Sequence, residues 1–424
     1  MSMELKDIAD VYGEELNIRQ FKKHIRQSPR AQEIAKRSKL NSADGKVIDE
    51  HDQFYRDHKL LLALFRLLGV MPVQRGQIGK ITFGWMSGPM LYAYIFYAVT
   101  TVVVMMVGYE RVDILLNKSR KFDEYIYSII FIIFLIPHFW IPFVGWGVAY
   151  EVCDYKNGWG TFQLHYYKIA GSNLEFPFLS SLIVIISLGC LILAVVFLLT
   201  LSALLEGFSL YHTTAYYHII TMINMNCALW YINCRAIGNA SHALADTFQK
   251  DIDRYCSAYI IFHYRILWLE LSELLQKIGN AYARTYATYS LFMITNITVA
   301  LYGFTSEVVD HGITFSFKEI GLLVDGVYCL VLLYIFCDCS HQASENIAGQ
   351  VQLSLLSISL TSVDLDTTRE IELFLKAIHL NPPTVSLQGY ADVNRKLITS
   401  SISTMAIYLI VLLQFKISLV NLRG

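Results

Sequence analysis

Residues 178–203, FLSSLIVIISLGCLILAVVFLLTLSA, form a run of 26 residues without a charged side chain. A helix of about 20 predominantly apolar residues crosses the hydrocarbon core of a bilayer, which is roughly 30 Å thick. Because lipid offers no hydrogen-bond partners, a spanning segment must be helical or part of a closed barrel. The length of this run therefore predicts a transmembrane helix.

The rest of the chain repeats this pattern, so the sequence predicts an all-α membrane protein with seven transmembrane helices. Of its 424 residues, 54% are hydrophobic and only 16% are charged, and the mean hydropathy is +0.42, outside the range of ordinary soluble domains. The predicted spans are Trp85–Val107, Tyr125–Val148, Phe178–Ala203, Thr214–Ile237, Tyr282–Phe304, Ile320–Cys337 and Leu397–Leu419.

The distribution of Lys and Arg predicts the orientation, because positively charged loops stay in the cytoplasm. Residues 1–80 carry 15 Lys and Arg residues, and the later inner segments carry more than the outer loops do. We therefore expect a cytoplasmic N-terminus and an extracellular C-terminus. No cleavable signal opens the chain, so the first span is expected to act as its own insertion signal.

Segments between the spans have apolar residues at helical spacing and predict a helical platform beneath the membrane. Phe54–Val70 predicts an amphipathic helix that leads into the membrane and is broken at Pro72 and Gly76. Ala243–Ala281 predicts cytosolic extensions of the helices on either side. A further helix around Glu370–Ile378 is followed by the breaker Asn381-Pro382-Pro383.

These predictions divide the chain into four parts. Residues 1–80 form a cytosolic arm, and residues 81–340 contain six transmembrane helices with the ligand pocket and the cytosolic extensions. Residues 341–396 form a cytosolic helical segment, and residues 397–424 form the last helix with a short outer tail. Asn117, in the sequon Asn117-Lys118-Ser119 of the first outer loop, is a candidate for glycosylation.

Several classes of function are not supported by the residues present. The net charge is −1 with no long basic block, which excludes a nucleic-acid partner. No phosphate-binding glycine loop, HExxH or GxSxG occurs, so we expect neither an enzyme nor a cofactor. Residues 337–341, CDCSH, lack a second ligand pair, so no metal is expected. The cysteines fall in spans or on the cytosolic side, where thiols stay reduced.

The last span has a regular stripe of residues along one face. Its members, separated by 4, 3, 4, 3 and 4 positions, are Ser400, Thr404, Ile407, Val411, Gln414 and Ser418. Four of the six are polar, so the stripe should face protein or water. A symmetric ring of such helices would form a narrow pore with an apolar constriction at Val411. Packing against a neighbouring helix of the same subunit explains the spacing equally well.

A second group of candidates gathers at the outer half of the fourth span. Ligand pockets between helices usually have apolar walls with a few polar groups, and this mixture of residues fits that description. Tyr and His are also common at the membrane interface. The group consists of Tyr211, His212, Tyr216, Tyr217, His218, Thr221 and Asn224, of which the last five are the pocket candidates. Asp325, within the sixth span, is a functional hypothesis because a buried carboxylate is costly, although pairing with a hydroxyl accounts for it as well. His138 and Trp140 of the second span are weaker candidates, and His138 also fits a satisfied core histidine.

Several motifs resemble a known family. Residues 407–415, IYLIVLLQF, resemble the signature that closes insect gustatory receptors, usually Thr-Tyr, five apolar residues and Gln-Phe. Ile407 departs from that pattern, whereas Tyr408, Gln414 and Phe415 match. Residues 138–146 (HFWIPFVGW), 215–230 (AYYHIITMINMNCALW) and 386–401 are similar to the carbon dioxide receptor branch of this family.

The resemblance implies a chemosensory, ligand-gated, non-selective cation channel in the plasma membrane of sensory neurons. It implies a tetramer around the last helix, assembled with paralogous subunits, with the pore and gate near Val411 and Gln414 and the ligand pocket in the outer half of the preceding helices. Thr404 and Ile407 share the pore-facing stripe. The ligand would be carbon dioxide or bicarbonate. A sugar-gated receptor channel is an alternative, as is a metabotropic seven-helix receptor, which would need an extracellular N-terminus.

Overall fold

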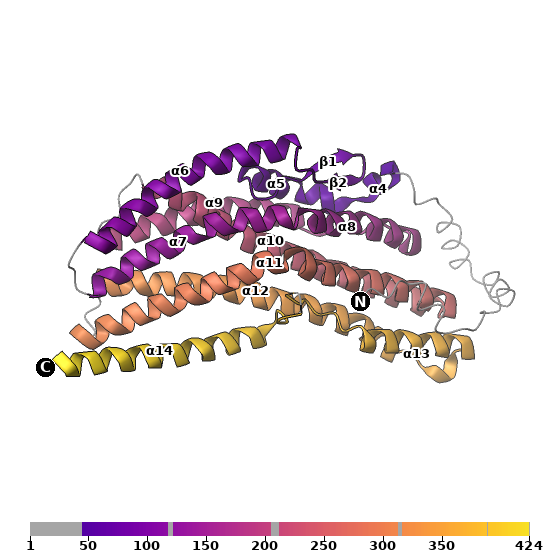
Figure 1. The fold of residues 1–424 in the computed structure, drawn as a ribbon. Helices are drawn as coiled ribbons and strands as arrows, with labels where there is room; N and C mark the ends of the chain where they lie inside the picture. Colours follow the sequence, from indigo (N-terminus) through magenta and orange to yellow (C-terminus); the bar gives the residue numbers. More distant parts are fainter. Residues whose placement is uncertain (1–44, 118–121, 205–211, 313–315, 388, 424) are drawn as a thin grey trace.

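Long helices lie side by side and form one elongated bundle (Figure 1). The computed structural model describes residues 45–117, 122–204, 212–312, 316–387 and 389–423. The helices of the bundle are α6 (Gly88–Asn117), α7 (Phe122–Gly147), α8 (Ala149–Ala170), α9 (Leu179–Leu204), α10 (Thr213–Arg254), α11 (Ala258–His311), α12 (Phe317–Leu356), α13 (Leu365–Leu380) and α14 (Arg395–Arg423).

A small subdomain precedes the bundle and contains α4 (Gly45–His51) and α5 (Gln53–Leu67). The Asp52 carboxylate caps α5 by accepting a hydrogen bond from the Tyr55 backbone amide at 3.0 Å. The amphipathic helix predicted here is confirmed as α5. The break after it is a hairpin of β1 (Gln74–Gln77) and β2 (Lys80–Thr82), whose turn uses Gly79 at φ +76°.

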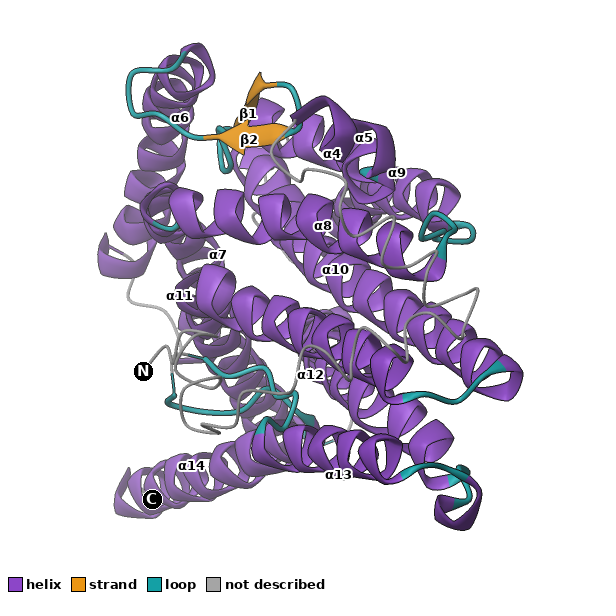
Figure 2. Cartoon of the chain, turned by 90° about the vertical axis from the view of Figure 1, so that its right-hand side faces the viewer, coloured by secondary structure: helices purple, strands orange, loops and turns teal. Residues whose placement is uncertain are grey.

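The membrane class of the fold is confirmed, since six described helices are long and apolar enough to cross a bilayer. They are α6, α7, α9, α11, α12 and α14. The predicted fourth span lies in α10, which is less apolar by the same measure. Figure 2 shows α10 in the middle of the bundle, and most of its residues between 215 and 237 are buried. Because protein rather than lipid surrounds α10, it tolerates polar residues that a lipid-facing helix would not.

The predicted platform is formed at one end of the bundle, opposite the C-terminus (Figure 1). α10 and α11 extend into it, as the periodicity indicated, and the structure adds a break between them at residues 255–257. The predicted helix around residues 370–378 is confirmed as α13. It packs on α11 through Phe374, which is fully buried 6.0 Å from the Trp268 ring, and through an Arg265–Glu370 ion pair of 3.2 Å.

Two features of the platform were not predicted. α8 continues almost directly from α7, with Val148 between them, and α12 runs to Leu356, well beyond the predicted end at Cys337. α8 buries Lys156, whose ammonium donates to the Asn233 side chain at 3.0 Å and lies 4.5 Å from the centre of the Phe54 ring. α8 therefore joins the α5 subdomain to the central helix α10.

Candidate pore helix and ligand pocket

α14 lies along α11 and α12 at one side of the bundle (Figure 1). In its apolar stretch 11% of the residues are buried, compared with 50% in α12. Its inward face includes Ser401 and Met405, which are 7% and 3% exposed. At its start Arg395 Nε lies 2.7 Å from a carboxylate oxygen of Asp338 on α12. Near its end Lys416 Nζ donates to the Ser306 carbonyl on α11 at 2.9 Å.

The predicted stripe lies on the opposite face of α14. All six of its residues are exposed, including the four pore candidates Thr404, Ile407, Val411 and Gln414. Ile407 is 63% exposed and Val411 is 41% exposed. The stripe therefore faces away from its own subunit, and packing inside one subunit does not account for its spacing.

The pocket candidates His138 and His218 meet between α6, α7 and α10. Their ring centroids are 6.0 Å apart, and the His138 ring stacks on Tyr97 at 4.9 Å. His138 is fully buried, and its Nε2 is 2.9 Å from the Thr101 hydroxyl. Its Nδ1 has no hydrogen-bond partner within the described ranges. Thr221, three residues after His218 on α10, is also buried, and its hydroxyl is likewise unsatisfied among the described residues.

A network of charged side chains, with Arg111 and His212 buried and Glu110 partly exposed, lies at the end of this region nearer the C-terminus of α6. Arg111 is 3% exposed, lies 4.5 Å from the centre of the Phe131 ring and is 3.0 Å from His212 Nδ1. His212 Nε2 is 3.0 Å from a carboxylate oxygen of Glu110. Tyr216 lies beside them and donates to the Phe131 carbonyl at 3.2 Å. Because the predicted first span ends at Val107, Arg111 was expected in an outer loop, although a Glu-Arg pair shortly after an apolar span also fits a helix that continues.

Asp325 belongs to a separate cluster between α11 and α12. The Asn296 amide donates to both of its carboxylate oxygens at 3.0 Å, and both side chains are buried. Asn224 accepts a 2.6 Å hydrogen bond from Tyr328 one turn further along α12, and its own amide donates to the Cys190 carbonyl on α9 at 3.4 Å. An amide, rather than the hydroxyl considered from the sequence, pairs with Asp325.

Residues 58–419 match the 7tm Chemosensory receptor family. The chain belongs to this family. It is 42% identical to gustatory and odorant receptor 22 of Anopheles gambiae over 391 residues, which cover 91% of this chain and 83% of that protein. It is 39% identical to gustatory and odorant receptor 21a of Drosophila melanogaster, covering 96% of this chain and 90% of that protein. These matches confirm the predicted resemblance to insect gustatory receptors.

The fold of this chemosensory receptor is similar to that of solved insect olfactory receptors. Olfactory receptor OR5 of Machilis hrabei superimposes with a TM-score of 0.59 at 10% identity, over 86% of this chain and all of that one. The same receptor in complex with eugenol gives a TM-score of 0.54 at 12% identity, over 87% of this chain and 99% of that one. At this identity the similarity shows the fold alone, and the family rests on the sequence matches.

The remaining predicted site residues of the receptor are spread over different surroundings. Tyr217 is half-buried, whereas Trp140 is 54% exposed and donates to the Thr288 hydroxyl at 2.7 Å, so it does not join the His138 cluster. A void of about 10 Å³ lies between α10, α11 and α12, enough for roughly one water. Asn117 is the last described residue of α6, and the rest of its sequon lies outside the described residues.

Proposed function

We propose that this receptor is a subunit of a ligand-gated, non-selective cation channel of sensory neurons, and that it detects carbon dioxide, directly or as bicarbonate, with a related subunit. The observation that carries the channel proposal is the exposed stripe of α14. Polar side chains in the apolar layer need water or protein partners. On that face the Thr404 hydroxyl bonds to the Ser400 carbonyl of α14 itself, and no other described helix supplies a partner to the stripe. Four copies of α14 arranged around a central axis would enclose a water-filled pore, and the stripe of each copy would face the water.

In this arrangement Val411 and Gln414 form the narrow part of the pore. Val411 supplies an apolar ring that opens or closes by wetting, and Gln414 supplies uncharged polar groups one turn further out. No acidic side chain is on the stripe, so the pore would select weakly among cations. Thr404 and Ile407 extend the same wall toward the platform.

The proposed ligand region lies between α6, α7 and α10, where His138 and His218 meet and Thr221 follows about one turn further along α10. Two buried polar atoms there, His138 Nδ1 and Thr221 Oγ1, have no partner among the described residues. Buried groups of this kind usually bond to a ligand or to ordered water. Carbon dioxide has three non-hydrogen atoms, so its binding energy is limited to about 4.5 kcal/mol and its Kd to roughly the millimolar range.

The direct test expresses the receptor with a paralogous subunit in cells that have no response of their own. We expect an inward cation current when dissolved carbon dioxide rises at constant pH. Varying bicarbonate at fixed dissolved carbon dioxide separates the two species, provided that the accompanying change of pH is also applied alone, without carbon dioxide, as a control. Absence of current in complexes that reach the cell surface would contradict the proposed ligand.

A second test separates the pocket from the pore. His218→Phe and Thr221→Val should shift the concentration of half-maximal response and leave the single-channel conductance unchanged. Trp140→Phe is the matched control, since Trp140 lies outside the cluster and should leave both quantities unchanged. A change of conductance without a change of sensitivity in the pocket variants would contradict the assignment of the ligand region.

A further inference from the structure

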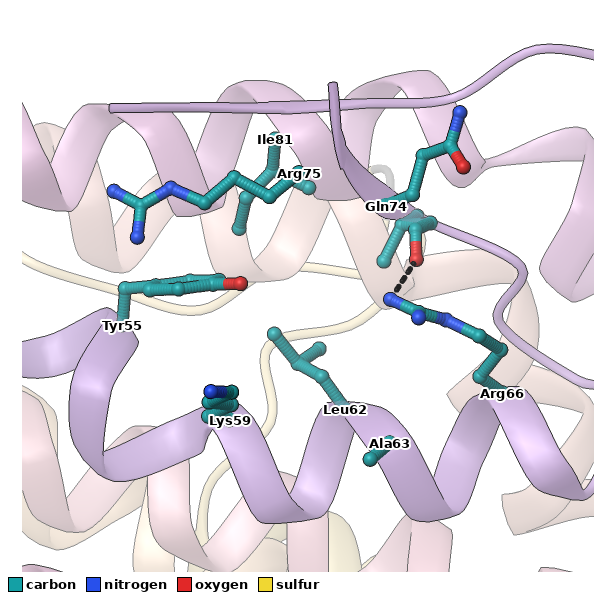
Figure 3. A pocket seen from close by; sticks show the side chains of 9 residues that line it. Tyr55, Lys59, Leu62, Ala63, Arg66, Gln74, Arg75 and Ile81 are labelled. Atoms are coloured by element: carbon teal, nitrogen blue, oxygen red, sulfur yellow. Dashed lines mark hydrogen bonds between the residues drawn. The ribbon is translucent and has the colours of Figure 1, made fainter. Parts of the chain in front are cut away.

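The α5 subdomain contains a pocket that the proposed channel function does not use (Figure 3). Its volume is about 130 Å³, and on the same measure a cavity needs only roughly 10–15 Å³ to hold one water. One wall is a stripe of α5 and the other is the β1–β2 hairpin. The lining residues are Tyr55, Lys59, Leu62, Ala63, Arg66, Val73, Gln74, Arg75 and Ile81.

Three of these lining residues are cations and none is acidic. Arg75 stacks on Tyr55, with its guanidinium carbon 4.1 Å from the ring centre, and pairs with Asp49 on α4. Arg66 donates to the Val73 carbonyl at 2.9 Å, which leaves its buried Nε without a partner in the described part of the chain. Lys59 is exposed at the mouth and makes no hydrogen bond or ion pair with the described residues.

The pocket therefore has a net positive charge, and some of its cations are already held in a position to bind an anion. Asp49 offsets one of the three charges, so two remain. Arg presents several donors in a fixed fork that matches the oxygens of phosphate, and Lys contributes a mobile point charge. The hairpin and Tyr55 hold Arg75 in place, which lowers the entropy lost when an anion binds.

The position of the pocket brings it close to a membrane surface. The C-terminal end of α5 contacts the first turns of α6, where the Tyr92 hydroxyl donates to the Leu67 carbonyl at 2.9 Å. Trp85 and Met86, directly before α6, are 45% and 86% exposed. Exposed aromatic residues beside the start of a span are typical of the headgroup layer.

We propose that this pocket binds a phosphate group, carried either by the headgroup of an anionic lipid of the adjoining leaflet or by a soluble organic phosphate. Lys59, Arg66 and Arg75 would contact its oxygens, while Leu62 and Ile81 form the apolar floor. This proposal does not depend on the channel function or on the identity of the chemical ligand.

The test uses the full-length receptor purified in a neutral detergent, where no charged bilayer attracts the probes. Binding of a short-chain phosphatidylinositol bisphosphate, of inositol trisphosphate and of short-chain phosphatidylcholine is measured by thermal shift and by native mass spectrometry. We expect saturable binding of the bisphosphate lipid and none of phosphatidylcholine. Equal binding of inositol trisphosphate identifies the phosphate groups as sufficient, and binding of the lipid alone identifies the membrane as the source.

Lys59→Gln should weaken binding at least about fivefold, since one cation near an anionic headgroup contributes roughly 1 kcal/mol. Lys59→Arg should retain binding. Lys80→Gln is the matched control, because Lys80 is an exposed cation of the same hairpin that does not line the pocket. Arg75→Gln provides a second variant from the other wall. Absence of saturable binding in both phosphate arms, or an equal loss in the Lys59→Gln and Lys80→Gln variants, would overturn the proposal.

Discussion

α10 and α14 both carry polar side chains through the apolar part of the bundle, but they direct them to opposite places. In α10, Asn224, Asn226 and Asn233 are buried, and each is hydrogen-bonded within the subunit. In α14 the polar stripe is exposed, and within the described part of the chain the Thr404 hydroxyl bonds only to the Ser400 carbonyl of its own helix at 2.9 Å. Polar groups in α10 therefore specify how the helices of one subunit pack, whereas those in α14 are available to partners outside it.

The comparison predicts that changes in α10 destabilise the subunit and that changes in α14 alter permeation. The largest expected effect on stability comes from Asn233→Leu. Asn233 accepts hydrogen bonds from Lys156 at 3.0 Å and from the Tyr155 hydroxyl at 3.2 Å. Two buried donors would lose their acceptor at roughly 1–3 kcal/mol each, so we expect a loss of about 3 kcal/mol in the free energy of unfolding.

This loss is measured by thermal unfolding of the purified receptor and by the fraction that reaches the cell surface. Asn233→Asp is the control, because a carboxylate can still accept from both donors. Unfolding of Asn233→Leu at the wild-type temperature would mean that the polar groups of α10 do not hold the platform together.

The next expected effect is a dependence of the free energy of unfolding on pH. Burial lowers the pKa of Lys156 to about 7 from its usual 10.5, and the nearby Asp52 opposes this only in part. Between these values the unfolded chain binds a proton that the folded chain does not, so stability should rise with pH. From pH 7 to pH 9 the gain is about 2 kcal/mol.

Thermal unfolding of wild type and Lys156→Met across this pH range isolates the contribution of Lys156. The Met variant should lose this part of the slope and should be the more stable protein near pH 7. If the unfolding temperatures of the two proteins changed with pH in parallel, Lys156 would be excluded as the source of the pH dependence.

A smaller effect is expected from Tyr328→Phe. The change removes the 2.6 Å hydrogen bond to Asn224 and keeps the stacking of the ring on Phe197 at 4.2 Å. Loss of one such bond costs about 1 kcal/mol, measurable as a lower melting temperature. Tyr334→Phe, at a 52% exposed site on the same helix, should leave the melting temperature unchanged. Equal effects of the two substitutions would argue against a special role for the Asn224 bond.

The smallest effect on stability, and a clear effect on permeation, is expected from Val411→Ala and Gln414→Ala. Exposed positions usually change stability by less than about 0.5 kcal/mol. The measurement is the relative permeability of cations and the single-channel conductance of the expressed channel. Leu412→Ala is the control, since Leu412 is exposed on the same turn but lies off the stripe. Wild-type permeation in both stripe variants would remove α14 from the pore wall.

The sequence predicted best what depends on periodicity within one segment. The apolar run of α9 and the stripe of α14 are both visible without knowledge of any partner helix. The end of α6 was wrong by about ten residues, Val107 against Asn117, because Arg111 is stabilised by Phe131 and His212, which lie far away in the sequence. α8 was missed for the same reason, since its polar residues are accommodated by contacts with α5 and α10.

The arrangement of the residues in the proposed ligand region could not be predicted, again because it depends on contacts between helices. His138 and His218 were each identified from their own span, but only the fold brings them together. Packing of α11 on α12 places Asp325 in a cluster with Asn296, whereas Trp140 lies at the surface. Hydropathy indicates which residues enter the membrane, but not which of them face each other there.

α14 contacts the other helices of its subunit near both of its ends. Arg395 fixes one end to Asp338 of α12, and Lys416 fixes the other to Ser306 of α11. Because these two contacts are made to different helices, the position of α14 and of its exposed stripe depends on how α11 and α12 lie relative to each other.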